Sequence, residues 1–214
     1  EKHKVVEKAW VFPNGVDDDV VDGIHPVVHE DLKRELDFVW AGRFSGEKRI
    51  TEFIGAFHTA NLPNVHLNIY GSGQLEAKVR LLLVQLGLGK SATFHGRLPH
   101  RELVARFAQA DLVAQSSVGF ETQGMTVYEA IAVGTPVLVA DPKIAAELPV
   151  DNVWLSKTPS VDDMARAMTR AAKDIRSGNT KRALDTGDWS VLQSQITAKM
   201  INIYKQAIKQ GPKL

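Results

Sequence analysis

From about residue 37 onward, short apolar runs alternate with segments whose apolar residues recur at helical spacing. Strands that alternate with helices of this length favour parallel pairing through right-handed crossovers, with helices on both faces of the sheet. The strand-like runs are 37–42, 65–70, 92–95, 111–114, 136–140 and 153–155. The sequence therefore predicts a doubly wound, mainly parallel α/β sheet of the Rossmann-like type.

Two regions lie outside this alternation. The first contains one short apolar run, 9–12, and then a polar stretch from Asp17 to Arg34 that we expect to form a surface loop. The last region carries an apolar stripe at helical spacing and is predicted to be an amphipathic helix; the stripe consists of Leu192, Ile196, Met200 and Ile203. The predicted units are a linker with a first short strand (1–36), a Rossmann-like domain (37–187) and a terminal helix (188–214).

The composition excludes several classes of function. The chain has 26 Lys and Arg against 25 Asp and Glu, so its charge gives no reason to expect a nucleic-acid partner. It has no cysteine, which excludes disulfides and thiolate metal sites, and none of its seven histidines has a partner at metal-binding spacing. No apolar run approaches the roughly 18 residues of a membrane span. We expect a cytoplasmic location, with peripheral membrane association as a property of the full-length protein.

In an open parallel sheet, ligands bind beyond the carboxyl ends of the strands, so the loops after the strands carry the candidate site. The first such loop, 42–48, places Arg43 and Lys48 before a predicted helix start. Helix N-termini attract anions, and two added cations make a clamp suited to a diphosphate. A solvated basic turn is the alternative for this loop taken alone.

The next two loops carry weaker signals. Gly71 and Gly73 resemble the start of a dinucleotide fingerprint, but Glu76 stands where the third glycine belongs, so we interpret the loop as a structural turn. The loop 95–99 follows the third strand and could place backbone groups beside a base. We interpret His95 itself as a hydrogen-bonded structural histidine.

The loop 120–130 carries the most information. Gly124 allows a tight backbone path, and a helix is predicted to start directly after it, leaving the N–H groups of Met125 and Thr126 free to face a ligand. Glu121 precedes this helix and Glu129 lies about one turn into it. Carboxylates accept hydrogen bonds on every lone pair and can hold the neighbouring hydroxyls of a sugar or a ribose. Two acids stabilised near a helix N-terminus are the structural alternative.

The candidate residues converge in one prediction. We expect the side chains of Arg43, Lys48, Glu121 and Glu129 to surround a common hollow, with the cations on a pyrophosphate and the acids on the flanking rings.

The spacing of Glu121 and Glu129, with seven residues between them, resembles the E-x7-E arrangement of the retaining glycosyltransferases of family 4, which have the GT-B architecture. Further segments that resemble this family are 11–17, 42–48, 69–73, 94–98 and 128–137. The resemblance covers only the C-terminal, donor-binding half of such enzymes. Together with the missing start methionine, it leads us to expect a piece of a longer protein that cannot hold the whole active site.

The resemblance also implies roles for residues. Arg43 and Lys48 would bind the donor diphosphate. Glu121 would contact the transferred sugar and Glu129 the ribose, while residues around Arg97 would hold the base. The implied catalytic residues are Arg43, Lys48 and Glu121. The implied donor-binding residues are Gly42, Arg97, Leu98, Gly124, Met125, Thr126 and Glu129. The architecture implies no metal and no cofactor beyond the sugar nucleotide.

Some positions depart from the family pattern. Thr122 and Gln123 replace the usual Gly-Phe after the first glutamate, and Arg49 stands where glycine commonly follows the lysine. Asp141 opens a segment that replaces a glycine-containing turn. We expect these changes to affect which sugar is transferred more than whether transfer occurs.

The resemblance implies transfer of a hexose from a nucleoside-diphosphate sugar, expected to be UDP-linked, with retention of configuration. The acceptor, a glycan, a lipid or a protein, would be bound through the missing N-terminal domain, toward which the terminal helix would pack. Two alternatives stay open: a nucleotide-sugar epimerase of related fold, and a non-catalytic partner subunit that kept the glycosyltransferase fold.

Overall fold

The computed structural model describes residues 12–27, 29–119, 121–148, 153–178 and 191–210. Its strands form one parallel sheet in the order β3-β2-β1-β4-β5-β6. The strands are β1 (Leu36–Arg43), β2 (Val65–Ser72), β3 (Ala92–Gly96), β4 (Leu112–Gln115), β5 (Val137–Val139) and β6 (Val153–Leu155). Each predicted strand from residue 37 onward is present. Most of the expected run 9–12 lies outside the described residues.

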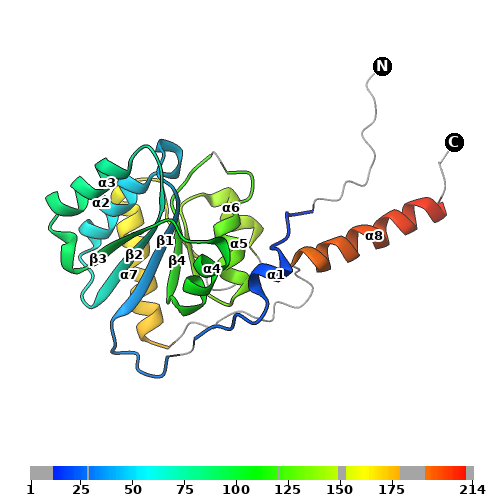
Figure 1. Ribbon diagram of the computed structural model, residues 1–214, viewed down its shortest axis with the longest axis horizontal. Helices are drawn as coiled ribbons and strands as arrows, with labels where there is room; N and C mark the ends of the chain where they lie inside the picture. Colours follow the sequence, from blue (N-terminus) through cyan, green and yellow to red (C-terminus); the bar gives the residue numbers. More distant parts are fainter. Residues whose placement is uncertain (1–11, 28, 120, 149–152, 179–190, 211–214) are drawn as a thin grey trace, which may run out of the picture.

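Helices cover both faces of this sheet, so the doubly wound prediction is confirmed (Figure 1). The longer helices are α2 (Ile50–Ala60), α3 (Glu76–Gln85), α4 (His100–Gln109), α5 (Met125–Ala132), α7 (Val161–Arg176) and α8 (Gln193–Gln210). The shorter ones are α1 (Asp18–Val21), α6 (Pro142–Glu147) and the 3-10 turns η1 (Gly46–Lys48) and η2 (Leu88–Lys90). One hydrophobic core lies under α2, α3 and α7, and a second lies under α4, α5 and α6.

The alternation of side chains along β1 explains the two cores. Phe38 and Trp40 point into the core under α2 and α7, whereas Val39 and Ala41 point into the core on the opposite face. All four side chains are buried. A strand that buries both faces must be apolar at successive positions, which is why this run is continuous rather than alternating.

The strand order reverses its direction at β1. From β1 the chain moves outward to β2 and β3, then crosses back to β4 on the other side of β1 and continues to β5 and β6. The loops that leave β1 and β4 therefore diverge and open a crevice between the carboxyl ends of these two strands. This is the position where open α/β sheets bind ligands.

The first described segment and the start of α8 are far apart in the sequence but in contact in the structure. Val16 is buried and forms a parallel bridge with Leu192. Gly15 fits against Gln193 so closely that a Cβ on it would stand 2.3 Å from the Gln193 Cα. The polar stretch after Asp17 is not wholly a loop, because Asp17 caps the short helix α1 and accepts from the Asp19 N–H.

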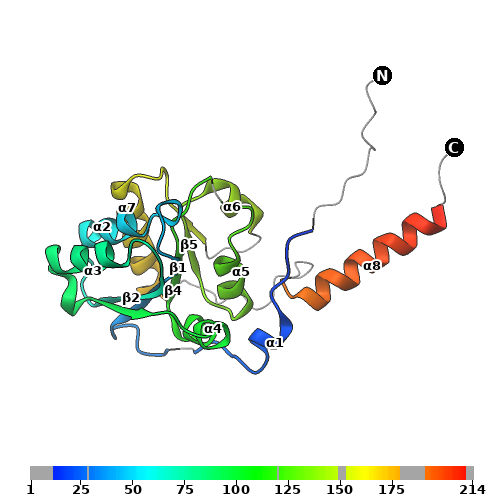
Figure 2. The same cartoon turned by 45° about the horizontal axis from the view of Figure 1, so that its top comes forward.

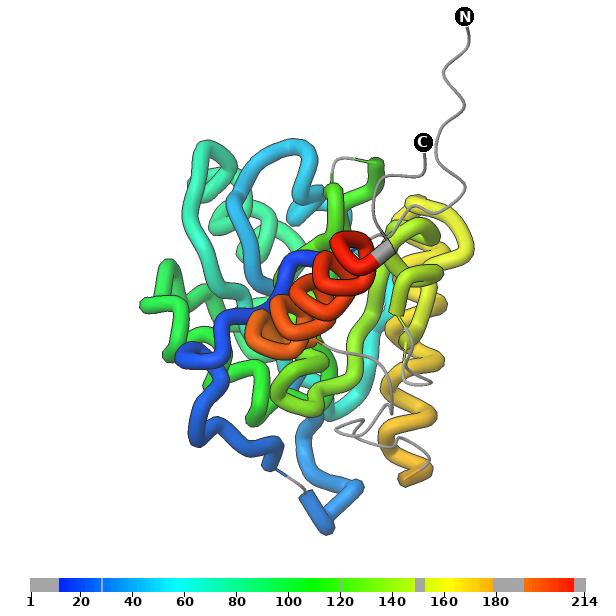
Figure 3. The backbone as a smooth tube through the Cα atoms, turned by 90° about the vertical axis from the view of Figure 1, so that its right-hand side faces the viewer, coloured from blue at the N-terminus to red at the C-terminus, as the bar shows by residue number. Residues whose placement is uncertain are grey.

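Helix α8 leaves the domain after its first turns (Figures 1 and 2). In Figure 3, which is turned by 90° from Figure 1, it lies in front of the rest of the domain and extends toward the viewer. Ile196 is buried at its base, while Tyr204 and Ile208 are 60% and 79% exposed. The predicted helix is thus present, and its outer part makes no core contact within the described residues.

Candidate active site

A hollow of about 180 Å³ opens at the point where the strand order reverses. Trp40 and Ala41 of β1, Gln115 of β4 and the two serines that follow it form the base of this hollow. Lys48 comes from the β1–α2 connection, and the segment from Glu121 to Thr126 supplies the remaining wall. We refer to it as the switch-point hollow.

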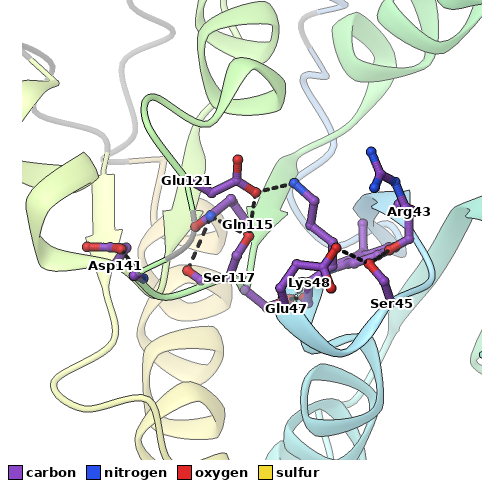
Figure 4. Close-up of polar contacts among 11 residues, drawn as sticks. Arg43, Ser45, Glu47, Lys48, Gln115, Ser117, Glu121 and Asp141 are labelled. Atoms are coloured by element: carbon purple, nitrogen blue, oxygen red, sulfur yellow. Dashed lines mark hydrogen bonds and ion pairs between the residues drawn. The ribbon is translucent and has the colours of Figure 1, made fainter.

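Lys48 is held in this hollow through its backbone. The Trp40 indole donates to Ser116 Oγ (2.8 Å), and the Ser116 hydroxyl donates to the carbonyl of Lys48 (2.6 Å). Trp40 and Ser116 are only 2% and 1% exposed, so this chain of bonds fixes the turn from inside the protein. The ammonium of Lys48 reaches across the hollow and pairs with Glu121 (Figure 4).

The residue after Lys48 explains one departure from the family pattern. Arg49 has a φ of 54°, in the left-handed region that favours glycine, and it lies between η1 and α2. Its guanidinium donates to the carbonyl of Pro159 (2.5 Å). Arginine therefore occupies a glycine-type backbone position and is held there by a long-range side-chain contact.

Glu121 belongs to a hydrogen-bond chain with a fixed direction (Figure 4). The Gln115 amide nitrogen donates to Ser117 Oγ (2.8 Å) and to the Ser117 carbonyl (3.2 Å). The Ser117 hydroxyl then donates to Glu121 Oε1 (2.8 Å), which also receives the Lys48 ammonium. The carbonyl oxygen of the Gln115 side chain is buried, and no described residue forms a hydrogen bond with it.

The loop before Glu121 is tied to the turn that opens α6. Asp141 is 2% exposed, and its two oxygens accept from the Gly119 N–H (2.7 Å) and from the Lys143 N–H (2.8 Å). The second bond caps α6. Asp141 therefore caps α6 and also anchors the loop that leads to Glu121.

Helix α5 starts at the wall of the switch-point hollow, as predicted. Gly124 is its N-cap with a φ of 73°, and Met125 and Thr126 both line the hollow. The first N–H groups of an α-helix have no acceptor within the helix, so this wall presents donors to an anion or a hydroxyl.

Gln123 joins this wall to the first described segment of the chain. Its amide nitrogen donates to the carbonyl of Asn14 (2.8 Å), and its amide oxygen accepts from the Asn14 N–H (2.6 Å). Gln123 is 6% exposed. Gln123, one of the residues that depart from the family pattern, thus holds Asn14 through two hydrogen bonds and places it at the rim of the hollow.

A second hollow, of about 490 Å³, lies on the other side of the end of β1. Gly42, Arg43 and Tyr70 line it from β1 and β2, and Arg97 and Leu98 line it from the β3–α4 connection. We refer to it as the β1–β2 hollow. It brings together the residues that the sequence assigned to the base and one of the two predicted diphosphate cations.

Tyr70 is fixed in the wall of the β1–β2 hollow by His95. The two rings are stacked with centroids 4.6 Å apart and planes 12° apart. The His95 ring nitrogen is hydrogen-bonded to Asn68 Oδ1 (2.5 Å), so His95 is the structural residue that the sequence predicted. Burial raises the pKa of the Tyr70 phenol, which therefore stays neutral and able to donate at physiological pH.

Glu129 faces this second hollow only through another residue. Its carboxylate is buried and bonded to the ring nitrogen of His100 (2.7 Å), and His100 itself lines the β1–β2 hollow. His100 was not among the residues predicted from the sequence. The available signal was its position directly after Pro99, at the start of a helix that follows a strand end.

The expectation of one common hollow for the four charged residues was wrong. Lys48 and Glu121 line the switch-point hollow, Arg43 lines the β1–β2 hollow, and Glu129 lies behind His100. The reason is that Arg43 ends β1 on its β2 side, whereas η1 carries Lys48 over the end of β4. In Figure 4 the guanidinium and the ammonium accordingly point in different directions.

The loop after β2 is a close-packed turn. Gly71 has a φ of 138°, and a Cβ on it would stand 1.9 Å from the carbonyl oxygen of Gly42. The glycines here are explained by backbone contact between the ends of β1 and β2, in agreement with the structural turn that we inferred.

The described part of the chain contains neither a cluster of side chains suited to a metal ion nor a membrane-spanning helix. Among these residues, no cluster of three or more histidine or acidic side chains could hold a metal ion. No helix within the described ranges is long and apolar enough to cross a membrane.

A parallel sheet with helices on both faces and loops gathered at its reversal point defines a Rossmann-like α/β domain. This fold matches that of GT-B glycosyltransferases. The chain belongs to the family described as glycosyl transferases group 1, whose family model matches residues 9–184. Sugar transfer is the activity named for its relatives.

Similar proteins include curated relatives and solved structures. An uncharacterised glycosyltransferase of Methanocaldococcus jannaschii is 28% identical over 193 residues, which are 85% of this chain and 47% of that protein. The chain thus spans about half the length of this relative. A Staphylococcus aureus TarM variant in complex with fondaparinux, α-GlcNAc-glycerol and UDP superposes with a TM-score of 0.70 and 20% identity, covering 93% of this chain and 40% of TarM.

A further similar protein is a domain solved by itself. The C-terminal domain of a glycosyl transferase group 1 protein, LpcC from Francisella tularensis, superposes with a TM-score of 0.64 and 21% identity. The match covers 87% of this chain and 98% of that domain. At these identities the two structural matches establish the fold alone.

Proposed function

We propose that this chain is the C-terminal, donor-binding domain of a retaining glycosyltransferase of family 4, and that its donor is a UDP-linked hexose. The main evidence is that Lys48, Glu121 and the N-terminus of α5 all line the switch-point hollow. A cation and free helix N–H groups suit the diphosphate, and the carboxylate suits sugar hydroxyls.

The β1–β2 hollow supplies the second half of the proposed donor site. Arg43 stands at its edge, where it can hold the diphosphate from the nucleoside side, and the wall formed by Arg97 and Leu98 suits the base. His100 and Glu129 together suit the ribose hydroxyls, because their pair combines an imidazole with a carboxylate acceptor. The donor then runs past the end of β1 and occupies both hollows.

The proposed chemistry places positive charge where the leaving group develops negative charge. When the bond between the anomeric carbon and the phosphate oxygen breaks, the electron pair stays with the nucleoside diphosphate. Lys48 and Arg43 stabilise that charge, and such stabilisation is commonly a large contribution to catalysis. Neither a metal nor another cofactor is part of this proposal.

The comparisons support the placement and the donor. Nearly the whole of the LpcC C-terminal domain matches this chain, and the TarM structure contains UDP. We infer that an N-terminal domain binds the acceptor, a glycan, a lipid or a protein, that α8 packs toward that domain, and that this chain alone does not transfer sugar. A cytoplasmic location with peripheral membrane association stays a prediction.

Calorimetry tests the donor. The 214-residue chain is titrated with UDP, ADP and GDP, each with and without magnesium. We expect heat of binding with UDP, weaker binding of the other two nucleotides and no requirement for magnesium. No binding of any nucleotide would overturn the proposal, and preference for another base would replace the uridine donor.

An assay of sugar transfer distinguishes an enzyme from a non-catalytic partner subunit of the same fold. In the protein that contains both domains, Lys48→Ala and Glu121→Ala are each expected to reduce transfer to the acceptor by at least about 100-fold. Unchanged transfer in both variants would favour the partner subunit. Interconversion of free sugar nucleotides without an acceptor would instead favour the epimerase.

A further inference from the structure

Among the described residues, the side chain of Gln115 has an acceptor without a partner, next to the hydrogen-bonded chain of Ser117, Glu121 and Lys48. Gln115 is the last residue of β4, is 6% exposed and lines the switch-point hollow. Its side-chain carbonyl oxygen is buried and has no hydrogen-bond partner within the part of the chain that the structure describes. Buried polar atoms in proteins nearly always have partners, so each exception calls for a physical reason.

The orientation of the Gln115 amide is fixed by its neighbours. One of its contacts is the backbone carbonyl of Ser117, which can only accept, so the amide nitrogen must face it. The other contact is Ser117 Oγ, whose own hydrogen is donated to Glu121 (Figure 4). Both N–H groups of Gln115 are therefore used within the protein, and exchanging its oxygen and nitrogen would break both bonds.

The free oxygen defines the chemistry of the group that it can bind. A carbonyl oxygen accepts only, so it repels a phosphate oxygen and requires an O–H or N–H donor. Lys48 and the first N–H groups of α5 are the donors in the same hollow and suit phosphate. The hollow thus contains phosphate-binding donors, and Gln115, one of its lining residues, carries a buried neutral acceptor that suits a hydroxyl.

We propose that the side-chain carbonyl of Gln115 accepts a hydrogen bond from a ring hydroxyl or an acetamido N–H of the transferred sugar, and so helps to determine which sugar is accepted. This inference rests on the proposed function, because it assumes that the diphosphate occupies the Lys48 side of the hollow. The oxygen is buried in the structure, so the sugar reaches it only when the amide rotates about its terminal torsion. This torsion is soft in glutamine, and the rotation exchanges the two contacts with Ser117 for the contact with the sugar.

A substitution that removes the acceptor tests the proposal. Gln115→Met has nearly the same size and shape, and Gln85→Met, at an exposed position on α3, is the matched control. Calorimetry measures the Kd of UDP and of the tightest-binding UDP-hexose for each protein. We expect the Gln115→Met Kd for UDP to stay within about 2-fold and the Kd for the UDP-hexose to rise about 3- to 10-fold.

Deoxy analogues identify the hydroxyl. For the unsubstituted chain, one of the single-deoxy UDP-hexoses is expected to bind about 3- to 10-fold more weakly than the parent sugar nucleotide. Gln115→Met should not distinguish this analogue from the parent. Two results would overturn the Gln115 inference while the donor proposal stands. One is that Gln115→Met raises the Kd values of UDP and UDP-hexose by the same factor, and the other is that every deoxy analogue binds the unsubstituted chain as tightly as the parent sugar nucleotide.

If Gln115→Met fails to fold, a measurement on the unsubstituted chain still tests the proposal. The side-chain ¹H–¹⁵N resonances of Gln115 should shift when a UDP-hexose is added and should shift much less with UDP. Equal shifts with both ligands would overturn the inference. Failure of the unsubstituted chain to bind UDP at all would instead overturn the proposed donor, and the contact assigned to Gln115 with it.

Discussion

The ammonium of Lys48 donates to Oε1 of Glu121 across the switch-point hollow, although the two residues are 73 positions apart in the sequence. Both side chains are partly buried, 28% and 17% exposed, so the pair is shielded more than a surface ion pair. An entering diphosphate competes with Glu121 for the ammonium, while the sugar hydroxyls can take over the carboxylate. Donor binding would then exchange one internal ion pair for two contacts with the ligand.

The first prediction concerns Lys48. Lys48→Met removes the charge and keeps much of the aliphatic stem, so we expect the Kd for UDP to rise about 10- to 100-fold, the range for a lost charged hydrogen bond. Lys90→Met, at an exposed site in η2, makes the same change of charge away from the hollow and should leave the Kd unchanged. Calorimetry with UDP measures both, and equal Kd values for the two variants would contradict the assigned role.

The second prediction concerns His100, which holds Glu129 at the edge of the β1–β2 hollow. In His100→Ala the carboxylate loses its orienting partner, so the Kd for UDP should rise about 3- to 10-fold. The Kd for 2′-deoxy-UDP should rise less, because that ligand lacks one of the hydroxyls concerned. His58→Ala, at the exposed end of α2, is the control. An equal loss for both nucleotides would argue that His100 does not act on the ribose.

The centre of the sheet could be predicted from the sequence because β1, β4 and β5 are buried on both faces. Continuous apolar runs such as 38–41 and 136–140 are typical of buried parallel strands when helical patterns separate them. The short helix α1 could not be predicted in this way. Three successive aspartates make the segment look like a polar loop. The apolar residues that follow them, Val20 and Val21, nevertheless pack against the core with Ile24.

The loops of the site could be predicted, but the direction of their side chains could not. Strand order along the chain places the loops at one edge of the sheet, which is why Lys48 and Glu121 were both assigned to the site. Whether Arg43 and Lys48 face one hollow depends on the 3-10 turn between them, which reorients the chain within a few residues. The two hydrogen bonds between Gln123 and Asn14 span 109 residues and leave no local pattern to detect.

The third prediction concerns the turn after β2. In Gly71→Ala the new Cβ would collide with the Gly42 carbonyl at a φ that other residues rarely adopt, so the ends of β1 and β2 must separate. We expect the free energy of unfolding to fall by about 2 kcal/mol or more. Gly89→Ala, where a Cβ meets no atom within 4 Å, should change it by less than about 0.5 kcal/mol. Urea denaturation measures both, and similar stabilities would show that the contact relaxes at little cost.

The last prediction is a pH dependence at Asp37, on β1. Burial raises the pKa of this carboxyl above the ordinary 3.8, although Asn68 donates to it and opposes the shift. Because the folded state holds this proton more tightly than the unfolded chain, the contribution of Asp37 to stability is most favourable below pH 3.8 and is lost as the pH rises through the folded pKa.

Asp37→Asn keeps the shape and can still accept from Asn68, but it carries no charge to desolvate. We therefore expect the variant to exceed the unsubstituted chain in free energy of unfolding at pH 7, with the difference shrinking as the pH is lowered toward 4. Urea denaturation at several pH values measures this difference. Asp22→Asn, at an exposed position, removes the same charge without a desolvation cost and should show no such convergence. A difference that grows on acidification would mean that the charged form of Asp37 stabilises the fold, because the network of Asn68 and Arg34 would then outweigh its burial.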